Sequence, residues 1–498
     1  MRVKRYLVFW LVLALLVGPC LARGGETGGE EAFVQALEED GFIVQKGRLG
    51  YLDLIKLHEA GLVPSAYGNN PATKYLAFFV PLAPGHTVDD QISQVQRPPG
   101  VSGNVSAFWN LRPDEAVVFV GRTPPECRYF CFDHIIMSRA YGNETRWLFA
   151  NIADALNNLV IRTEGTPNGT PGNPYNQTTV IVATADRGID RRIRAAARSA
   201  GYSDDAMNTQ VFPASILNLG LENDSDTFAI HLRPALFTDQ QAGDDYIDNT
   251  PATVLRVTPG NATQLDPYGY PKLRVRGTGM TELDLTDDLE DLRNAILTRY
   301  SGLKARELPA SAGFPAGIDA IQRGIDAVGP TNDAAYLWSA NQTVSSATPP
   351  FFNTSQYYGF LRDPAVTLGN DTDEFIIVYG VNHVATGKAT YSSFAVYGAD
   401  VWNGVGSITD LDFNGTAEEY LPDNPDAKYL YVYKIARNCD GDPRCFEVPY
   451  GAGGHGIDLD QPLLILWRIY LENATKTGPS YEEIVYDRAI KFDPASQG

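Results

Sequence analysis

The stretch VVFVGRTPPECRYFCFDHIIM, residues 117–137, holds two apolar runs on either side of a Gly-Arg-Thr-Pro-Pro turn. Residues 117–120 are apolar at every position, which predicts a strand buried on both faces. Pro124 and Pro125 interrupt this strand, and residues 129–136 resume as a second one. The stretch therefore predicts two neighbouring core strands.

A similar pattern recurs later in the chain, which predicts a degenerate repeat. The aligned segments are VVFVG (117–121) with IIVYG (376–380), YFCF (129–132) with YSSF (391–394), and residues 180–182 with 431–433. Two β-rich units of this kind account for a chain of 498 residues.

Helical patterns lie between and around the β-rich units. Residues 178–213 predict a β-α-β unit with Asp186 as the helix N-cap, and residues 287–300 predict an amphipathic helix. A helix over 147–159 and a strand over 272–276 are also predicted. The fold class is therefore α+β, with a β-α-β and helical region inserted between two β-rich units.

The expected domain organisation has four parts. These are a signal peptide (1–22), a mixed α/β N-terminal domain (23–340), a linker (341–370) and a β-rich C-terminal domain (371–498).

KATYSSFAVYGAD (388–400) and PLLILWRIY (462–470) resemble a family of secreted bacterial proteins made of two consecutive β-sandwich domains of unknown function. The resemblance covers at most a quarter of the chain. It implies the sandwich architecture and carries no chemistry.

The N-terminus predicts export. Arg2, Lys4 and Arg5 precede an apolar run too short for a comfortable membrane span, and cleavage is expected after Ala22. A lipoprotein anchored through Cys20 and an uncleaved anchor are the alternatives. No membrane span is expected in the mature chain. The net charge of −20 argues against a nucleic-acid partner.

Asn-x-Ser/Thr sequons are in excess, since about three or four would arise by chance. They lie at Asn104, Asn143, Asn168, Asn176, Asn223, Asn261, Asn341, Asn353, Asn370, Asn414 and Asn473. The excess predicts N-glycosylation on a secreted or surface protein. Asn/Thr-rich turns of a β protein are the alternative interpretation.

Removal of Cys20 leaves an even number of cysteines, which predicts two disulfides in an exported chain. Cys439 and Cys445 flank an Asp/Gly/Pro-rich turn, so a local bridge is expected there. For Cys127 and Cys131 a local bridge is expected if the chain bends after Pro125. A crossed pairing between the halves is the alternative.

Two constellations are candidates for chemistry. Asp133 and His134 adjoin but point to opposite faces of a strand, so a partner from another strand is needed, and the candidates are His231, His383 and Asp186. Asp410, Asp412 and Asn414 open an EF-hand-like D-x-D-x-N-G loop that predicts calcium, although Leu421 replaces the bidentate glutamate.

Two functional hypotheses follow. The first is a secreted glycoprotein that binds a small molecule, a glycan or a surface without catalysis. The second is a secreted hydrolase-type enzyme with a site around Asp133, His134 and His383. The sequence does not decide whether the protein is an enzyme.

Overall fold

A computed structural model describes residues 26–86, 104–166, 172–314, 317–339, 366–451 and 455–495. The predicted signal peptide and most of the predicted linker lie outside these ranges. Within them, several β-sheets combine with helices, so the predicted α+β class is confirmed.

The first unit has two sheets. Its outer sheet has the order β1 (Phe42–Lys46), β14 (Ala252–Pro259), β5 (Ala116–Arg122), β10 (Thr178–Thr184), β11 (Met207–Val211). Its inner sheet has the order β2 (Arg48–Tyr51), β3 (Leu76–Pro81), β12 (Thr227–Leu232), β7 (Cys131–Tyr141), β8 (Glu144–Asn151). Short strands β4 (Val105–Ser106) and β9 (Leu156–Asn157) pair with β3 and β7, and β6 (Cys127–Tyr129) pairs with β13 (Ala235–Phe237).

The second unit has the same layout. Its outer sheet has the order β15 (Lys304–Leu308), β24 (Arg488–Asp493), β18 (Phe375–Val381), β21 (Leu430–Ala436), β22 (Cys445–Glu447). Its inner sheet has the order β16 (Ala310–Ala312), β17 (Ala334–Ser339), β23 (Leu463–Tyr470), β19 (Tyr391–Gly398), β20 (Asn403–Thr409).

The helices are distributed over both units. They are α1 (Glu26–Glu39), α2 (Leu54–Glu59), α3 (Arg187–Ser199), α4 (Gln240–Asp248), α5 (Thr286–Arg299) and α6 (Gly317–Arg323). Short 3-10 helices are η4 (Asp204–Ala206), η5 (Leu283–Leu285), η6 (Asp410–Asp412) and η7 (Ala427–Tyr429). Asp186 caps α3 as predicted, because its side chain accepts a hydrogen bond from the amide of Ile189.

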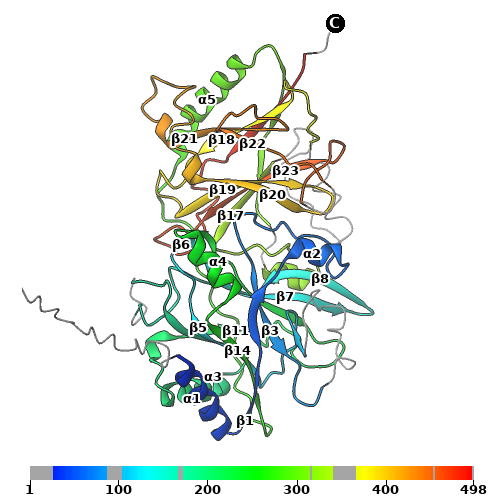
Figure 1. Ribbon diagram of the computed structural model, residues 1–498, viewed down its shortest axis with the longest axis vertical. Coiled ribbons are helices and arrows are strands. Elements are labelled where there is room, and N and C mark those ends of the chain that lie inside the picture. Colours follow the sequence, from blue (N-terminus) through cyan, green and yellow to red (C-terminus); the bar gives the residue numbers. More distant parts are fainter. Residues whose placement is uncertain are drawn as a thin grey trace, which may run out of the picture.

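The four large sheets are stacked along the long axis of the molecule (Figure 1). Hydrophobic clusters join outer to inner sheet within each unit, and a further cluster joins the two inner sheets. Helices α1 and α3 cover one end of the stack and α5 covers the other. Because another sheet or a helix covers each face of the four large sheets, the core strands are apolar at nearly every position.

The strand orders confirm the predicted repeat. Each strand of the two five-strand orders in one unit has a counterpart with the same neighbours in the other unit, and β10–β11 and β21–β22 are both parallel. Strands β5 and β18 have equal length, so Gly121 corresponds to Gly380 as aligned. Val180 pairs with Val120, whereas Val432 pairs with Tyr379, so residues 180–182 correspond to 432–434. The predicted alignment of this strand was displaced by one residue.

Strand pairing crosses the predicted linker. Strands β15 and β17 precede residue 341, yet they pair with β24 and β23 near the C-terminus. We therefore describe residues 286–339 with the second unit, although the sequence pattern grouped them with the N-terminal domain. Local composition does not reveal a pairing partner more than one hundred residues away.

Two predicted elements differ from the structure. The prediction of a helix at residues 147–159 is wrong, because β8 pairs with β7 as the second strand of a hairpin. The hairpin turns at Gly142, which has a φ of +63°. The strand expected at residues 272–276 is wrong as well. That segment has no strand partner, and Arg274 and Arg276 bind backbone carbonyls of both units.

The sequon asparagines within the described ranges are all exposed. They are Asn104, Asn143, Asn176, Asn223, Asn261, Asn370, Asn414 and Asn473. Asn168, Asn341 and Asn353 lie outside the described residues. No helix in the described part of the chain is long and apolar enough to cross a membrane.

Candidate functional site between the two units

Each unit extends a loop onto the inner sheet of the other. In the loop that follows α2, the amide of Gly68 donates to the carbonyl of Trp402 at 2.8 Å. In the loop that follows α6, the amide of Gly329 donates to the carbonyl of Phe149 at 2.6 Å. The two contacts are reciprocal, so the boundary between the units is enclosed by chain from both.

Backbone strain gathers at this crossing. Gly68 and Gly329 have φ of +62° and +64°, and an added Cβ would lie 3.2 Å from the Trp402 ring and 2.7 Å from the Phe149 ring. Four of the nine non-glycine residues with positive φ in the described ranges are here, namely Tyr67, Phe149, Val328 and Trp402. Such conformations are costly for bulky side chains, and they concentrate at binding and catalytic sites.

Two buried arginines approach the crossing from opposite sides. Arg233 follows β12 and Arg468 lies in β23, and they are 6% and 4% exposed. Arg468 Nη2 donates to the carbonyl of Gly68 at 2.7 Å, and Arg233 Nη1 donates to that of Gly329 at 3.1 Å. Each arginine therefore binds a glycine of positive φ in the facing loop.

The arginines occupy corresponding positions of the repeat. In the predicted alignment, Phe132 corresponds to Phe394. The amide of Arg233 binds the carbonyl of the residue before Phe132, and Arg468 pairs with the residue before Phe394. The guanidinium groups also lie over the rings of Tyr75 and Tyr336, at 5.6 Å and 5.9 Å. The site is thus built from equivalent parts of both units.

A small inner chamber separates the arginines. About 20 Å³ of it is open to the centre of a water molecule, enough for one or two small polar groups. Its aromatic lining consists of Tyr67, Tyr75, Phe149, Phe314, Tyr336, Trp402 and Tyr470. The chamber therefore combines apolar walls with two cationic groups.

An outer chamber adjoins the inner one, because Phe314, Pro330 and Tyr336 line both. Its corresponding volume is about 210 Å³. One wall is the crossing segment, residues 260–282, which contributes Tyr270, Leu273 and Arg276. Together the two chambers have the concave, mainly apolar character of a small-molecule site.

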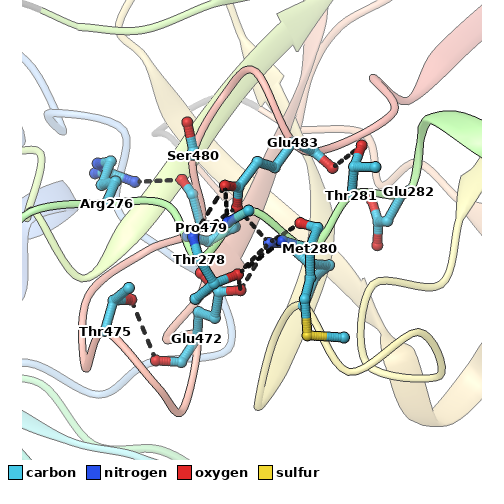
Figure 2. A network of polar contacts seen from close by, with 12 residues as sticks. Arg276, Thr278, Met280, Thr281, Glu282, Glu472, Thr475, Pro479, Ser480 and Glu483 are labelled. Carbon is cyan, nitrogen blue, oxygen red and sulfur yellow. Dashed lines mark hydrogen bonds and ion pairs between the residues drawn. The ribbon is translucent and has the colours of Figure 1, made fainter.

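The end of the crossing segment is anchored in the second unit. Lys388 Nζ lies 2.6 Å from Glu472, 2.7 Å from Glu483 and 2.9 Å from the carbonyl of Met280. Figure 2 shows Thr278 and Met280 beside the two glutamates. Since Glu483 also accepts the amide of Thr278 at 2.9 Å, this wall of the outer chamber is held in place by charged contacts.

The two arginines differ in their counter-charge. Arg233 Nη2 lies 2.9 Å from Asp133, and Asn151 also donates to this carboxylate. Burial raises the pKa of Asp133 to about 6, against the opposing effect of Arg233. Asp133 follows Phe132 in β7, and the residue that follows Phe394 in β19 is Ala395. Arg468 therefore lacks a carboxylate at the position where Arg233 has one.

Among the predicted site residues, Asp133 reaches this boundary and His134 does not. His134 faces the outer sheet, where Nε2 lies 3.1 Å from the carbonyl of Val211 and the ring contacts Phe212. Burial lowers the pKa of His134 to about 4. His231 lies opposite Asp133 in the register, and burial together with Arg233 lowers its pKa to about 3.

His383 lies in a separate cluster of the second unit. Its Nδ1 lies 2.8 Å from Glu282 and its Nε2 lies 3.1 Å from Asp487. Although burial disfavours the cation, the two carboxylates raise the pKa of His383 to about 10. Tyr431 donates to Asp487 at 2.8 Å. Within the described residues, this imidazolium shares no hydrogen-bond or ion-pair partner with Asp133 or His134, so the three residues do not form a common centre in this structure.

The predicted calcium ligands also have other partners. Asp410 accepts a bond from Arg128 at 2.7 Å, and Asn414 accepts one from Asn382 at 3.2 Å. Asp412 binds Thr409. Across the described ranges, no group of three or more His, Cys, Asp or Glu side chains is arranged to hold a metal ion.

Of the two predicted disulfide bonds, one is confirmed and the other is wrong. Cys439 and Cys445 form the expected disulfide, with Cα atoms 5.6 Å apart. Cys127 and Cys131 are free, buried thiols, so neither the local nor the crossed bridge is present. They begin consecutive strands, β6 and β7, and their side chains belong to different hydrophobic clusters. The bend after Pro125 precedes both strands and therefore does not bring the cysteines together.

Sequence reasoning did not single out Arg233, Arg468, Tyr75 or Tyr336. The only available signal was the repeat itself. Extending the alignment of Phe132 with Phe394 through the neighbouring strands would have matched the arginine of HLRP (231–234) with that of LWRIY (466–470). That extension requires the strand pairing, which is a property of the fold.

Similar solved structures include two bacterial proteins. The VPA0106 protein from Vibrio parahaemolyticus is 11% identical, with 94% of this chain and 99% of that chain covered and a TM-score of 0.36. An uncharacterised protein from Burkholderia cenocepacia is 12% identical, with 94% and 86% covered and a TM-score of 0.35. No family model and no curated protein matches the sequence. The chain thus resembles uncharacterised bacterial proteins over most of its length.

Proposed function

We propose that the protein is an exported, N-glycosylated binding protein that takes up a small organic molecule between its two units, without catalysis. The observation that carries this proposal is the pair of adjoining chambers, which share the lining residues Phe314, Pro330 and Tyr336, with two buried arginines lining the inner one. Pockets of this kind, apolar with a few fixed polar groups, are typical of ligand sites.

Export rests on separate support. The predicted signal peptide, the excess of sequons and the resemblance to secreted two-domain proteins agree with one another. All eight described sequon asparagines are accessible to a glycosyltransferase, since they are exposed. We expect protein secreted from a glycosylating host to lose mass on enzymatic deglycosylation. Unmodified peptides across most sequons would contradict this part of the proposal.

The arrangement favours binding over hydrolysis. A hydrolase site needs a nucleophile or an activated water beside a general base. Asp133, His134 and His383 have different partners, and burial raises the pKa of the Cys131 thiol well above its usual range. We therefore rank the hydrolase alternative below the binding protein.

The test uses calorimetric titration of the secreted protein with three one-ring probes: benzoate, benzyl alcohol and benzylamine. They share a planar apolar body and differ in the charge of the head group. We expect at least one of them to bind at a ratio of one per chain. Failure of all three at millimolar concentration would contradict the proposal, because an accessible aromatic chamber should accept at least one ring.

A blocking variant locates the binding. Leu273→Trp enlarges a side chain that lines the outer chamber, and we expect it to abolish probe binding. Leu265→Trp is the matched control, because Leu265 is 47% exposed on the same crossing segment and does not line a chamber. Equal binding by both variants would show that the probe binds elsewhere.

A further inference from the structure

We infer that Arg468, opposite Arg233, is an anion subsite that receives the carboxylate of a small organic acid whose apolar body occupies the outer chamber. This inference rests on the proposed function and specifies the class of ligand. It follows from the charge balance of the two repeat-related arginines, from the donors that remain open and from the dimensions of the two chambers.

The charge balance differs between the units. Asp133 neutralises Arg233, whereas Ala395 stands at the corresponding position near Arg468. Among the residues the structure describes, no carboxylate forms an ion pair with Arg468. A buried guanidinium remains charged at any physiological pH, and such a charge is normally paired. The positive charge of Arg468 therefore remains available for the negative charge of a ligand.

The hydrogen-bond donors of Arg468 are also incompletely used. Among the described residues, it donates to the hydroxyl of Tyr397 at 2.6 Å and to the carbonyl of Gly68 at 2.7 Å. Arg437, equally buried at 4% exposure, instead binds backbone carbonyls of five residues. Since a guanidinium has five N–H groups, Arg437 uses its donors more fully than Arg468, which retains capacity for an acceptor.

On the other side of the chamber, Arg233 has capacity as well. Its Nε has no hydrogen-bond acceptor among the described residues. The inner chamber therefore presents donors from both units. Guanidinium groups bind carboxylates through paired, charge-assisted hydrogen bonds, which makes a carboxylate the matching head group.

Size and wall chemistry define the rest of the ligand. The inner chamber accommodates one or two small polar groups, as the two oxygens of a carboxylate require, and the outer chamber of about 210 Å³ accommodates a body. Phe314 and Tyr336 line both chambers, and their rings favour a planar or branched apolar body. Asp154 and Arg276 also line the outer chamber, so one part of its wall is charged. The ligand class is therefore a small apolar monocarboxylate.

The experiment compares benzoate with benzyl alcohol in a buffer without chloride, using the secreted protein. We expect benzoate to bind about 10- to 100-fold more tightly, as charge-assisted hydrogen bonds predict. Chloride is titrated separately, and we expect it to compete only weakly. If chloride bound as tightly as benzoate, the site would be one for monatomic anions, and the inference of an organic acid would be overturned.

Two variants test the residues. Arg468→Met should remove the benzoate preference, so that benzoate and benzyl alcohol then bind with similar affinity, while the control Arg437→Met should retain the preference. Ala395→Asp introduces the counter-charge that the first unit carries, and we expect benzoate affinity to fall about tenfold. If either variant does not fold, Arg468→Lys retains the charge but not the planar fork, and it should still weaken benzoate by severalfold.

Failure of the inference is distinguishable from failure of the proposed function. If benzoate and benzyl alcohol bind equally and Arg468→Met changes neither, the anion subsite is overturned and the binding protein stands. If none of the probes binds, both are overturned. A benzoate preference that survives in Arg468→Met and Ala395→Asp would also overturn the assignment of Arg468.

Discussion

Arg233 and Arg468 hold corresponding positions in the two units, each over a tyrosine in or directly before the neighbouring strand and each bonded to a glycine of the facing loop. They differ in one neighbour, because the first has Asp133 and the second has Ala395 in its place. The two units therefore share the backbone and aromatic surroundings of the arginine, but only the first unit has a carboxylate beside it. The difference suggests that one unit retained a self-neutralised arginine while the other left its arginine open to a ligand.

His383 extends the comparison to a third buried cation. It is 1% exposed and lies between Glu282 and Asp487, whose other oxygens accept further hydrogen bonds. A buried cation whose two ring nitrogens are both bonded to carboxylates is structural. The contrast with Arg468 can be tested by removing each charge in turn and measuring the stability.

The largest effect is expected for His383→Ala. The substitution leaves two buried carboxylates without their cation, and we expect a loss of about 3–5 kcal/mol in the free energy of unfolding. Urea titration measures it. His455→Ala is the control, since His455 is exposed, and it should change stability by less than about 0.5 kcal/mol. A small effect at His383 would contradict its structural role.

The same residue predicts a pH dependence. Its folded pKa of about 10 lies above its ordinary value of 6.5, so its stabilising contribution is complete below about pH 6.5. That contribution decreases as the pH rises and is largely lost near pH 10. We expect the difference in unfolding free energy between wild type and His383→Ala to shrink over this range. A constant difference would show that His383 is not protonated in the fold.

Asp133→Ala should have the next largest effect, because it makes the first unit resemble the second. Arg233 then loses its counter-charge and Asn151 loses its acceptor. We expect a loss of about 2–4 kcal/mol, partly restored by benzoate. Thermal unfolding with and without benzoate measures both. Asp224→Ala, at an exposed position, is the control. An equal loss of stability in that variant would show that the ion pair of Asp133 with Arg233 does not contribute to stability.

The smallest effect is expected for Arg468→Met. Two hydrogen bonds are lost, but so is an unpaired buried charge, and we expect a net loss of about 1 kcal/mol. Arg437→Met should cost more, because several backbone carbonyls lose their donor. Urea titration of both variants compares them. The reverse order would indicate that Arg468 is the structural arginine.

Much of the fold was predictable because its signals are local. The fully apolar strands near residues 117 and 376, the capped helix after Asp186 and the repeat of strand and turn all follow from short-range patterns. The local disulfide at Cys439 follows from a tight turn in the same way. The misjudged segment at 147–159 has mixed spacing, and its pairing with β7 outweighed its weak helical pattern.

The candidate site was less predictable, because its residues come from distant parts of the chain. Asp133 was selected for its neighbour His134, yet its partner is Arg233 and its significance depends on Ala395. Cys127 and Cys131 are close in sequence but separated by the strand geometry. Short sequence distance was a poor guide in both cases.

By itself, the sequence determined the fold class, the repeat and the positions of most core strands, since hydrophobic periodicity and turn residues act over a few residues. Only the tertiary structure decided that the inner sheets face each other, that loops carrying Gly68 and Gly329 cross between units and that Arg468 lies at a chamber without a carboxylate. Burial and charge balance depend on side chains brought together from opposite halves of the chain. No local pattern contains that information.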